Sequence, residues 1–308
     1  MNNKLLVRRN IVGYYMLIPA TILFLLINAF PLVYGLILSL TDKNYTKPKS
    51  GKFVGLENFK SILHDSEFWS IMGYTIVYTV FVVAFSYLLG LALAVLLNKN
   101  IKFRGVFRAL ALFPWVIPTV VAAQNWRWLF NDQLGFINRT LMELSIIKEP
   151  ILFLANADLA RLSVIIVAIW KSYPFMMVVL LAGLQSIGDE MYEPAYIDGA
   201  NRTKIFWYIT MPTLKPMSIV CTTLMGLWTF NTLSFDNIYL LTQGGPSGST
   251  YVMSIQSYYT AIYRGKIGYA SAISVMMMVI IALAVLIYAI AKYTAAIKEQ
   301  RNAGDVNG

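Results

Sequence analysis

Six long apolar runs constrain the fold of this chain more than any other feature. They lie at about residues 11–40, 68–97, 106–130, 162–184, 217–241 and 267–291. About 20 consecutive apolar residues can cross the hydrocarbon core of a bilayer as an α-helix, because a helix satisfies its own backbone hydrogen bonds. Only 13% of the residues are charged, which is low for a soluble domain. The sequence therefore predicts an all-α, polytopic membrane protein with six transmembrane helices in a single domain, residues 1–308.

Prolines and flanking charges indicate where these spans begin and where they bend. The first run follows Lys4, Arg8 and Arg9 and is too long for the core of a signal peptide. A proline lacks the N–H that a helix needs, so two pairs of prolines are expected to kink or interrupt the first and third spans. These are Pro19, Pro31, Pro114 and Pro118.

The reactive residues exclude several function classes. One cysteine, Cys221, and one histidine, His64, cannot form an internal disulfide, a cysteine cluster or a histidine metal site. The chain has no Gly-x-x-x-x-Gly-Lys-Ser/Thr loop for phosphates and no Gly-x-Ser-x-Gly or His-Glu-x-x-His motif. The net charge of +10 fits anionic lipid better than nucleic acid in so apolar a chain. We therefore expect no catalytic group, metal or cofactor in this chain.

A polar segment, residues 185–215, separates the fourth and fifth runs. Asp189 and Glu190 suit the first turn of a helix, where acids meet exposed N–H groups. Gly199 can adopt a positive φ and turn the chain, and Pro212 and Pro216 punctuate the approach to the next span. The segment is predicted to form a short helix, a turn and a second short helix at the membrane surface.

The same segment resembles the EAA loop of ABC importer permeases. That pattern is Glu-Ala-Ala, three residues, Gly, nine residues and Ile-x-Leu-Pro. The matching residues here are Glu193-Pro194-Ala195, Gly199 and Ile209-Thr210-Met211-Pro212, with Pro194 and Met211 departing from the pattern. An ordinary amphipathic loop is the alternative, but the spacing over twenty residues favours the resemblance. It implies docking in a cleft of a separate ATPase subunit, with coupling residues Glu193, Ala195, Asp198, Gly199, Ala200 and Pro212.

Shorter matches extend the resemblance over nearly the whole chain. Residues 53–59, 89–98, 113–118 and 235–246 are similar, in order and spacing, to the importer permeases for oligosaccharides and related solutes. The resemblance implies that the chain forms half of a transmembrane pathway. A second homologous permease would form the other half, two ATPase subunits would bind ATP and Mg, and an extracellular solute-binding protein would deliver the substrate. Whether the second permease is a different chain or a copy stays open.

The fifth run carries the best candidates for contact with a solute. In the family members that have a membrane binding site, residues of this span contact the solute, and the positions carried over are Trp228, Asn231, Phe235, Asp236 and Tyr239. Carboxylates and amides bind sugar hydroxyls, and aromatic rings stack on C–H faces. The alternative is that aromatic residues form an interface belt and amides bond between helices. Weaker candidates are Trp115, Gln124 and Trp126, and for Lys171 a structural role is favoured over neutralising an acidic solute.

The distribution of positive charge indicates how the spans are oriented. Six spans put both termini on one side, and a slight excess of Lys and Arg there favours the cytoplasm. The docking resemblance also implies cytoplasmic termini, in the inner membrane. An ABC permease for glycerol phosphate or an acidic saccharide is an alternative. An ion-coupled secondary transporter would need buried acids, and Asp236 is the only acid well inside a span. An intramembrane enzyme would need paired catalytic groups at one depth, and none is visible.

Overall fold

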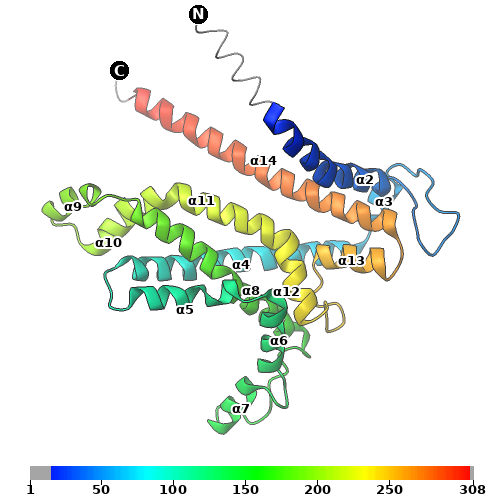
Figure 1. Ribbon diagram of the computed structural model, residues 1–308, viewed down its shortest axis with the longest axis horizontal. Helices are drawn as coiled ribbons and strands as arrows, with labels where there is room; N and C mark the ends of the chain where they lie inside the picture. The colour runs from blue at the N-terminus through cyan, green and yellow to red at the C-terminus, as the bar shows by residue number, and fades with distance from the viewer. Residues whose placement is uncertain (1–14, 306–308) are drawn as a thin grey trace, which may run out of the picture. The chain divides into compact units, whose positions relative to one another are not determined.

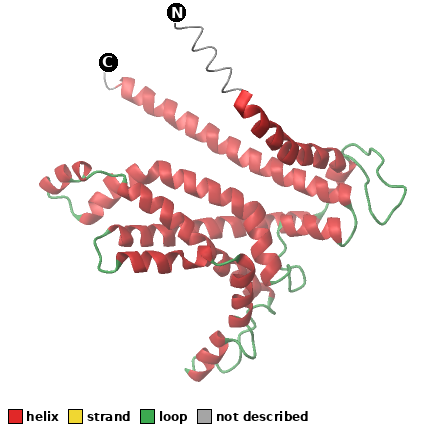
Figure 2. Cartoon of the chain, in the orientation of Figure 1, coloured by secondary structure: helices red, strands yellow, loops and turns green. Residues whose placement is uncertain are grey.

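The structure, a computed structural model, describes residues 15–305. Within that range the chain forms helices joined by loops and no β-strand, as Figure 1 and Figure 2 show. The predicted all-α class is therefore confirmed. Lys4, Arg8, Arg9 and the first residues of the first apolar run lie outside the described residues.

Four helices are long and apolar enough to cross a membrane. They are Tyr15–Ser39, Ser66–Asn98 (α4), Ala157–Gln185 (α8) and the Ile267–Ile290 part of α14, which runs from Ile267 to Asp305. A bent pair, α5 (Arg104–Val116) and α6 (Thr119–Leu129), makes a fifth candidate. The run predicted at 217–241 is α11 (Met211–Trp228), a π-helical turn (Thr229–Leu233) and α12 (Ser234–Leu241). With this more polar run the structure is consistent with six spans.

The third predicted span, residues 106–130, is not one continuous rod. Its two helices meet at 93° around Ile117 and Pro118. Pro118 disfavours helical angles in the residue before it, and Ile117 is accordingly extended, with φ −62° and ψ 133°. Pro114, in contrast, stays inside α5. Only one of the two prolines expected to interrupt this span therefore breaks it.

Lys171 of α8 stabilises that break. Its ammonium donates to the carbonyl oxygens of Pro114 at 2.9 Å and Trp115 at 3.4 Å, and also to that of Ile117. These carbonyls lie at the C-terminal end of α5, where backbone oxygens have no partner in the helix and carry partial negative charge. The structural role favoured for Lys171 is what its contacts show.

Two other prolines sit in helices that continue through them. Pro31 follows a π-helical turn at Leu25–Ala29 at the start of α2 (Phe30–Ser39), and Pro212 follows another at Phe206–Thr210. In each case the carbonyl four residues before the proline lies inside the π turn. Such a turn adds one residue to the helix, which relieves the clash between the proline ring and that carbonyl.

The chain divides into two compact units, Met1–Ser66 with Gln256–Gly308, and Glu67–Ile255. In the first unit α2 packs along α14, and a loop leads from α2 to α3 (Glu57–Leu63). Asp42 Oδ1 orders this loop by accepting from the N–H of Gly51 at 2.6 Å and of Lys52 at 2.7 Å. These N–H groups, Gly51 first, hold the pKa of Asp42 below its ordinary value.

The second unit holds a core built mainly from α4, α8 and α11, with α5 packed on α8 (Figure 1). Its largest buried side chains include Met176, Met177, Leu180 and Leu214. Gly90 of α4 permits the closest approach, since a Cβ there would lie 2.6 Å from Met176 Cβ. The single permease domain over 1–308 stays a prediction.

Candidate functional site: a docking hairpin joined to a polar helix face

The polar segment after α8 forms the predicted helix, turn and helix. A 3-10 turn (Asp189–Met191) leads to α9 (Glu193–Ile197) and then α10 (Arg202–Ile205). Gly199, between the two helices, has φ +75°, the left-handed conformation that the sequence predicted for it. Asn201 caps α10 by accepting from the Lys204 N–H at 2.8 Å. We call residues 189–205 the docking hairpin.

The structure brings five of the six predicted coupling residues together on this hairpin. The Ala200 N–H donates to the Ala195 carbonyl at 2.9 Å and closes the turn at Gly199. Glu193 and Asp198, which both precede this turn in the chain, are exposed. The sixth residue, Pro212, lies in the first turn of α11 instead.

The hairpin also exposes large apolar side chains that the sequence analysis missed. Met191 is 51% exposed, Tyr196 59% and Ile197 85%. Apolar side chains exposed close together are typical of surfaces that contact another molecule. The sequence could have predicted this exposure, because two helices this short cannot bury every apolar residue that they carry.

No break in the helical backbone separates the hairpin from the polar face of the fifth span. From α10 the chain continues through the π turn at Phe206–Thr210, α11, the π turn at Thr229–Leu233 and α12. Figure 1 shows α10 leading into α11 and α11 into α12. The second helix of the hairpin and the polar face therefore lie on one continuous helical element.

All five predicted path residues lie on the open side of this element. Trp228, Asn231 and Asp236 are exposed, and Phe235 and Tyr239 are half-buried. The rings of Phe235 and Tyr239 stack with their centroids 5.3 Å apart and their planes at 7°. The structure thus gathers aromatic, amide and carboxylate groups along one face.

Other polar residues of the same span have structural roles. Asn237 is buried, and its Nδ2 donates to Tyr78 Oη at 3.3 Å and to the Val164 carbonyl at 3.2 Å. Ser234 is also buried, and its hydroxyl donates to the Asn231 carbonyl at 3.1 Å. Asn237 thus bonds to other helices, as the alternative expected, whereas this bond of Ser234 stays within its own helix.

An aromatic row connects the broken third span to the start of this face. Trp115 lies 6.1 Å from Phe175 of α8, and Phe175 lies 5.1 Å from Trp228, between ring centroids. Phe175 was not among the residues predicted from the sequence. Trp126 packs instead on Trp170 at 5.5 Å and on Phe130 at 5.1 Å, away from that row.

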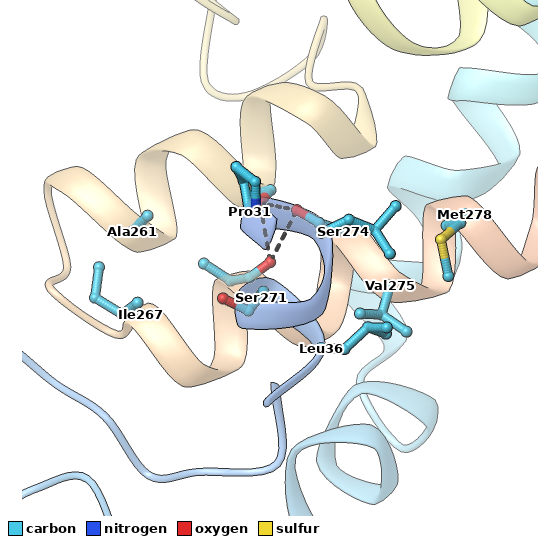
Figure 3. A pocket seen from close by; sticks show the side chains of 12 residues that line it. Pro31, Leu36, Ala261, Ile267, Ser271, Ser274, Val275 and Met278 are labelled. Carbon is cyan, nitrogen blue, oxygen red and sulfur yellow. Dashed lines mark hydrogen bonds between the residues drawn. The ribbon is translucent and has the colours of Figure 1, made fainter. Parts of the chain in front are cut away.

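The first unit has a groove of about 400 Å³ that the sequence analysis did not predict. Residues of α2, among them Pro31 and Leu36, and residues of α14, among them Ser271 and Ser274, line it (Figure 3). Ser274 Oγ lies 2.9 Å from Ser257 Oγ, and the Ser257 hydroxyl donates to the Ala270 carbonyl. Among residues 15–305 no three His, Cys, Asp or Glu side chains are placed to hold a metal ion.

Comparison with known proteins identifies the family. The family model described as "Binding-protein-dependent transport system inner membrane component" matches residues 86–292. The chain is 36% identical to the trehalose/maltose transport system permease protein MalF of Thermococcus litoralis, over 94% of this chain and 96% of that protein. It is 32% identical to the trehalose transport system permease protein SugA of Mycobacterium tuberculosis, over 86% of this chain and 83% of that one.

A solved structure shares the fold. A chain of a bacterial alginate ABC transporter crystal structure superposes with a TM-score of 0.78 at 23% identity, over 91% of this chain and 93% of that one. The family model and the relatives agree with this fold. The chain therefore belongs to the family of binding-protein-dependent transport system inner membrane components, the permease subunits of ABC transporters.

Proposed function

We propose that this permease subunit lines half of the pathway for a neutral saccharide or glycoside that a solute-binding protein delivers. Its partners would be a second homologous permease and two ATPase subunits, which bind ATP and Mg. The docking hairpin and both termini would face the cytoplasm. ATP would be hydrolysed in the ATPase subunits, and this chain would supply the helices that line the pathway and move.

The observation that carries the proposal is the unbroken helical run from α10 to α12. When the ATPase subunits close on ATP, they would move the hairpin. Because packed helices move as rigid bodies, the polar face would move with it and open to alternate sides of the membrane. Coupling would then need no covalent step in this chain.

The exposed surface of the hairpin suits a protein cleft. Met191, Tyr196 and Ile197 offer apolar contact area, and Glu193 and Asp198 offer charge beside it. Interfaces combine an apolar centre with a polar rim in this way. The coupling roles given to Glu193, Ala195, Asp198, Gly199, Ala200 and Pro212 are part of this proposal.

The solute class follows from the groups on the polar face. Trp228, Phe235 and Tyr239 can cover the C–H face of a sugar, and Asn231 and Asp236 can bind its hydroxyls. Lys171 donates to three backbone carbonyls, so its ammonium has few donors left for an acidic solute. The carboxylate of Asp236 would also repel anions. We therefore favour a neutral saccharide over glycerol phosphate or an acidic saccharide, in keeping with the trehalose and maltose relatives.

Substitution of Gly199 tests the coupling role. Proline cannot adopt the φ of +75° that Gly199 has, whereas asparagine tolerates the left-handed region. A Cβ at this position meets nothing within 4 Å, so neither variant adds a steric clash from the Cβ. In proteoliposomes with the whole importer, Gly199→Pro should reduce ATP-driven solute uptake by at least roughly tenfold. Gly199→Asn should keep most of the uptake.

Insertion and expression of both variants are measured alongside. Glu193→Lys, which reverses an exposed charge, should also lower uptake without loss of insertion. Normal uptake by a properly inserted Gly199→Pro protein would refute the coupling role. Uptake that persists without the ATPase subunits and stops with a protonophore would favour an ion-coupled transporter instead.

A further inference from the structure

Arg104 and Arg108 form a cationic pair at the start of α5. They are four residues apart, so they lie on one face of the helix. With the Gln185 amide oriented by these partners, its oxygen accepts from Arg104 Nη2 at 2.7 Å and from Arg108 Nη2 at 2.6 Å. Arg108 Nη2 also donates to the Leu97 carbonyl at 3.5 Å. Two positive charges thus converge on neutral oxygens at the ends of α4 and α8.

This pair has no acidic partner among the residues that the structure describes. The ion pairs found there join Arg139 to Glu143 and Arg161 to Asp158. The Nε atoms of both Arg104 and Arg108 are buried and make no hydrogen bond. Like charges held together and buried donors left without partners both cost free energy. An anion beside the pair would offset the repulsion between the two charges.

We propose that Arg104 and Arg108 bind the phosphate group of an anionic phospholipid. The fork of a guanidinium matches phosphate oxygens in pairs. Gly105 stands between the arginines in the chain, and a Cβ there would meet nothing within 4 Å. The start of the helix, which is the positive end of its dipole, adds positive potential at the same place.

The surface of α5 points to lipid as the source of the phosphate. Val106 is 57% exposed, Phe107 50% and Leu110 64%. These large apolar side chains lie within two turns of the arginines, on a helix that forms part of a candidate span. The arginine pair therefore lies where an apolar helix surface meets the polar ends of α4 and α8, which is the level of lipid head groups.

The site has a second consequence for the second unit. Gln185 is the last residue of α8, directly before the segment that leads into the docking hairpin, and the loop into α5 lies at the same end of this unit as the hairpin (Figure 1). A bound phosphate would tie the start of α5 to the end of α8. The lipid would thus steady the base from which the hairpin extends. Binding itself depends on neither the solute nor the coupling role.

Lipid titration of the purified importer in detergent tests this proposal. Short-chain phosphatidylglycerol is added, and its apparent affinity is read from the rise in the midpoint of thermal unfolding. The double variant Arg104→Gln, Arg108→Gln should lose about 30-fold in affinity. Lys99→Gln, Lys102→Gln removes the same charge from the loop directly before α5 but spares the pair, and it should lose less than about threefold in affinity.

Matched ligands identify the source of the phosphate. Phosphatidylcholine and inorganic phosphate at the same concentrations should leave the midpoint unchanged. A shift with inorganic phosphate equal to that with phosphatidylglycerol would overturn the lipid assignment. So would unchanged lipid affinity in the double variant together with loss of its ATPase subunits, which would assign the arginines to a protein partner.

A charge-conserving variant guards against misfolding. Arg104→Lys, Arg108→Lys keeps both charges but loses the planar forks, and it should bind phosphatidylglycerol with an affinity between those of the wild type and the glutamine variant. Affinity equal to that of the wild type in both double variants would refute the site. These measurements use neither solute nor ATP, so a failure of the proposed transport function leaves their outcome unchanged.

Discussion

At the scale of single residues, two asparagines of the fifth span show how position decides role. Asn237 is buried and donates to Tyr78 and Val164, whereas Asn231 is exposed on the polar face. Asn237→Leu should therefore lower the stability of the importer by roughly 1–3 kcal/mol, because a buried hydroxyl and carbonyl lose their donor. Asn231→Leu should change stability by less than about 0.5 kcal/mol.

Solute uptake should distinguish the same two variants, with the larger effect now in Asn231→Leu. Asn231→Leu should raise the KM for solute, since a group that binds hydroxyls is lost, and thermal unfolding should match that of the wild type. An equal loss of stability in both variants, or a normal KM in Asn231→Leu, would contradict the division between structural and path residues. The matched residue type makes each variant the control of the other.

Sequence alone could not separate these asparagines, for a reason that lies in the backbone. The π turn at Thr229–Leu233 adds one residue to the helix between Trp228 and Ser234. Every later side chain is then rotated from the position that a regular period of 3.6 residues predicts. Spacing identified the polar cluster, but which members face inward depends on that local rotation.

At the scale of elements, helix packing in the second unit depends on how closely α4 approaches α8. A Cβ on Gly90 would lie 2.6 Å from Met176 Cβ and 2.9 Å from the Met177 backbone nitrogen. The backbone cannot move aside as a flexible side chain can, so Gly90→Ala should destabilise the importer by about 1–3 kcal/mol. Detergent-solubilised protein would show this as a lower midpoint of thermal unfolding.

Gly73, on the same helix, is the control. A Cβ there meets nothing within 4 Å, so Gly73→Ala should leave stability unchanged or raise it by up to about 1 kcal/mol, since alanine is the better helix former. Wild-type stability in Gly90→Ala would show that α4 and α8 can separate without cost. Lower stability in Gly73→Ala would show that something covers its open surface.

The breaks between elements were harder to predict than the elements. Four prolines were expected to kink or interrupt helices: Pro31, Pro114, Pro118 and Pro212. Only at Pro118 does a helix end. Two of the others follow π turns, and the break at Pro118 has its free carbonyls satisfied by Lys171, which lies far along the chain. Such compensation comes from backbone register and tertiary contact, which a local pattern does not contain.

At the scale of the whole molecule, sequence predicted the architecture better than the surfaces. Apolar runs mark spans because the bilayer imposes one length, and the docking hairpin followed from one motif and one glycine. The arginine pair at the start of α5 and the exposed Ile197 were missed. Both depend on what the folded chain leaves uncovered, which becomes visible only when all helices are in place.

The orientation of the chain in the membrane can be tested by cysteine labelling, because the chain has a single cysteine. Cys221 is the only cysteine and is fully buried, so the wild type should not react with a membrane-impermeant maleimide. If the docking hairpin is cytoplasmic, Tyr45→Cys and Leu134→Cys should react in intact cells, since both positions are exposed and the predicted six-span topology puts their loops on the other side of the membrane. Asn100→Cys and Ile197→Cys should react only after the membrane is opened.

Two positions on each side protect this experiment from local shielding. A bound ATPase subunit would cover Ile197 but would leave open the separate loop that carries Asn100, so slow labelling of Ile197→Cys alone still fits a cytoplasmic hairpin. The reverse pattern, with Asn100→Cys labelled in intact cells and Tyr45→Cys protected, would place the hairpin outside. No cytoplasmic ATPase could then reach it, and the coupling of hairpin to polar face would have to be abandoned, whatever solute the importer carries.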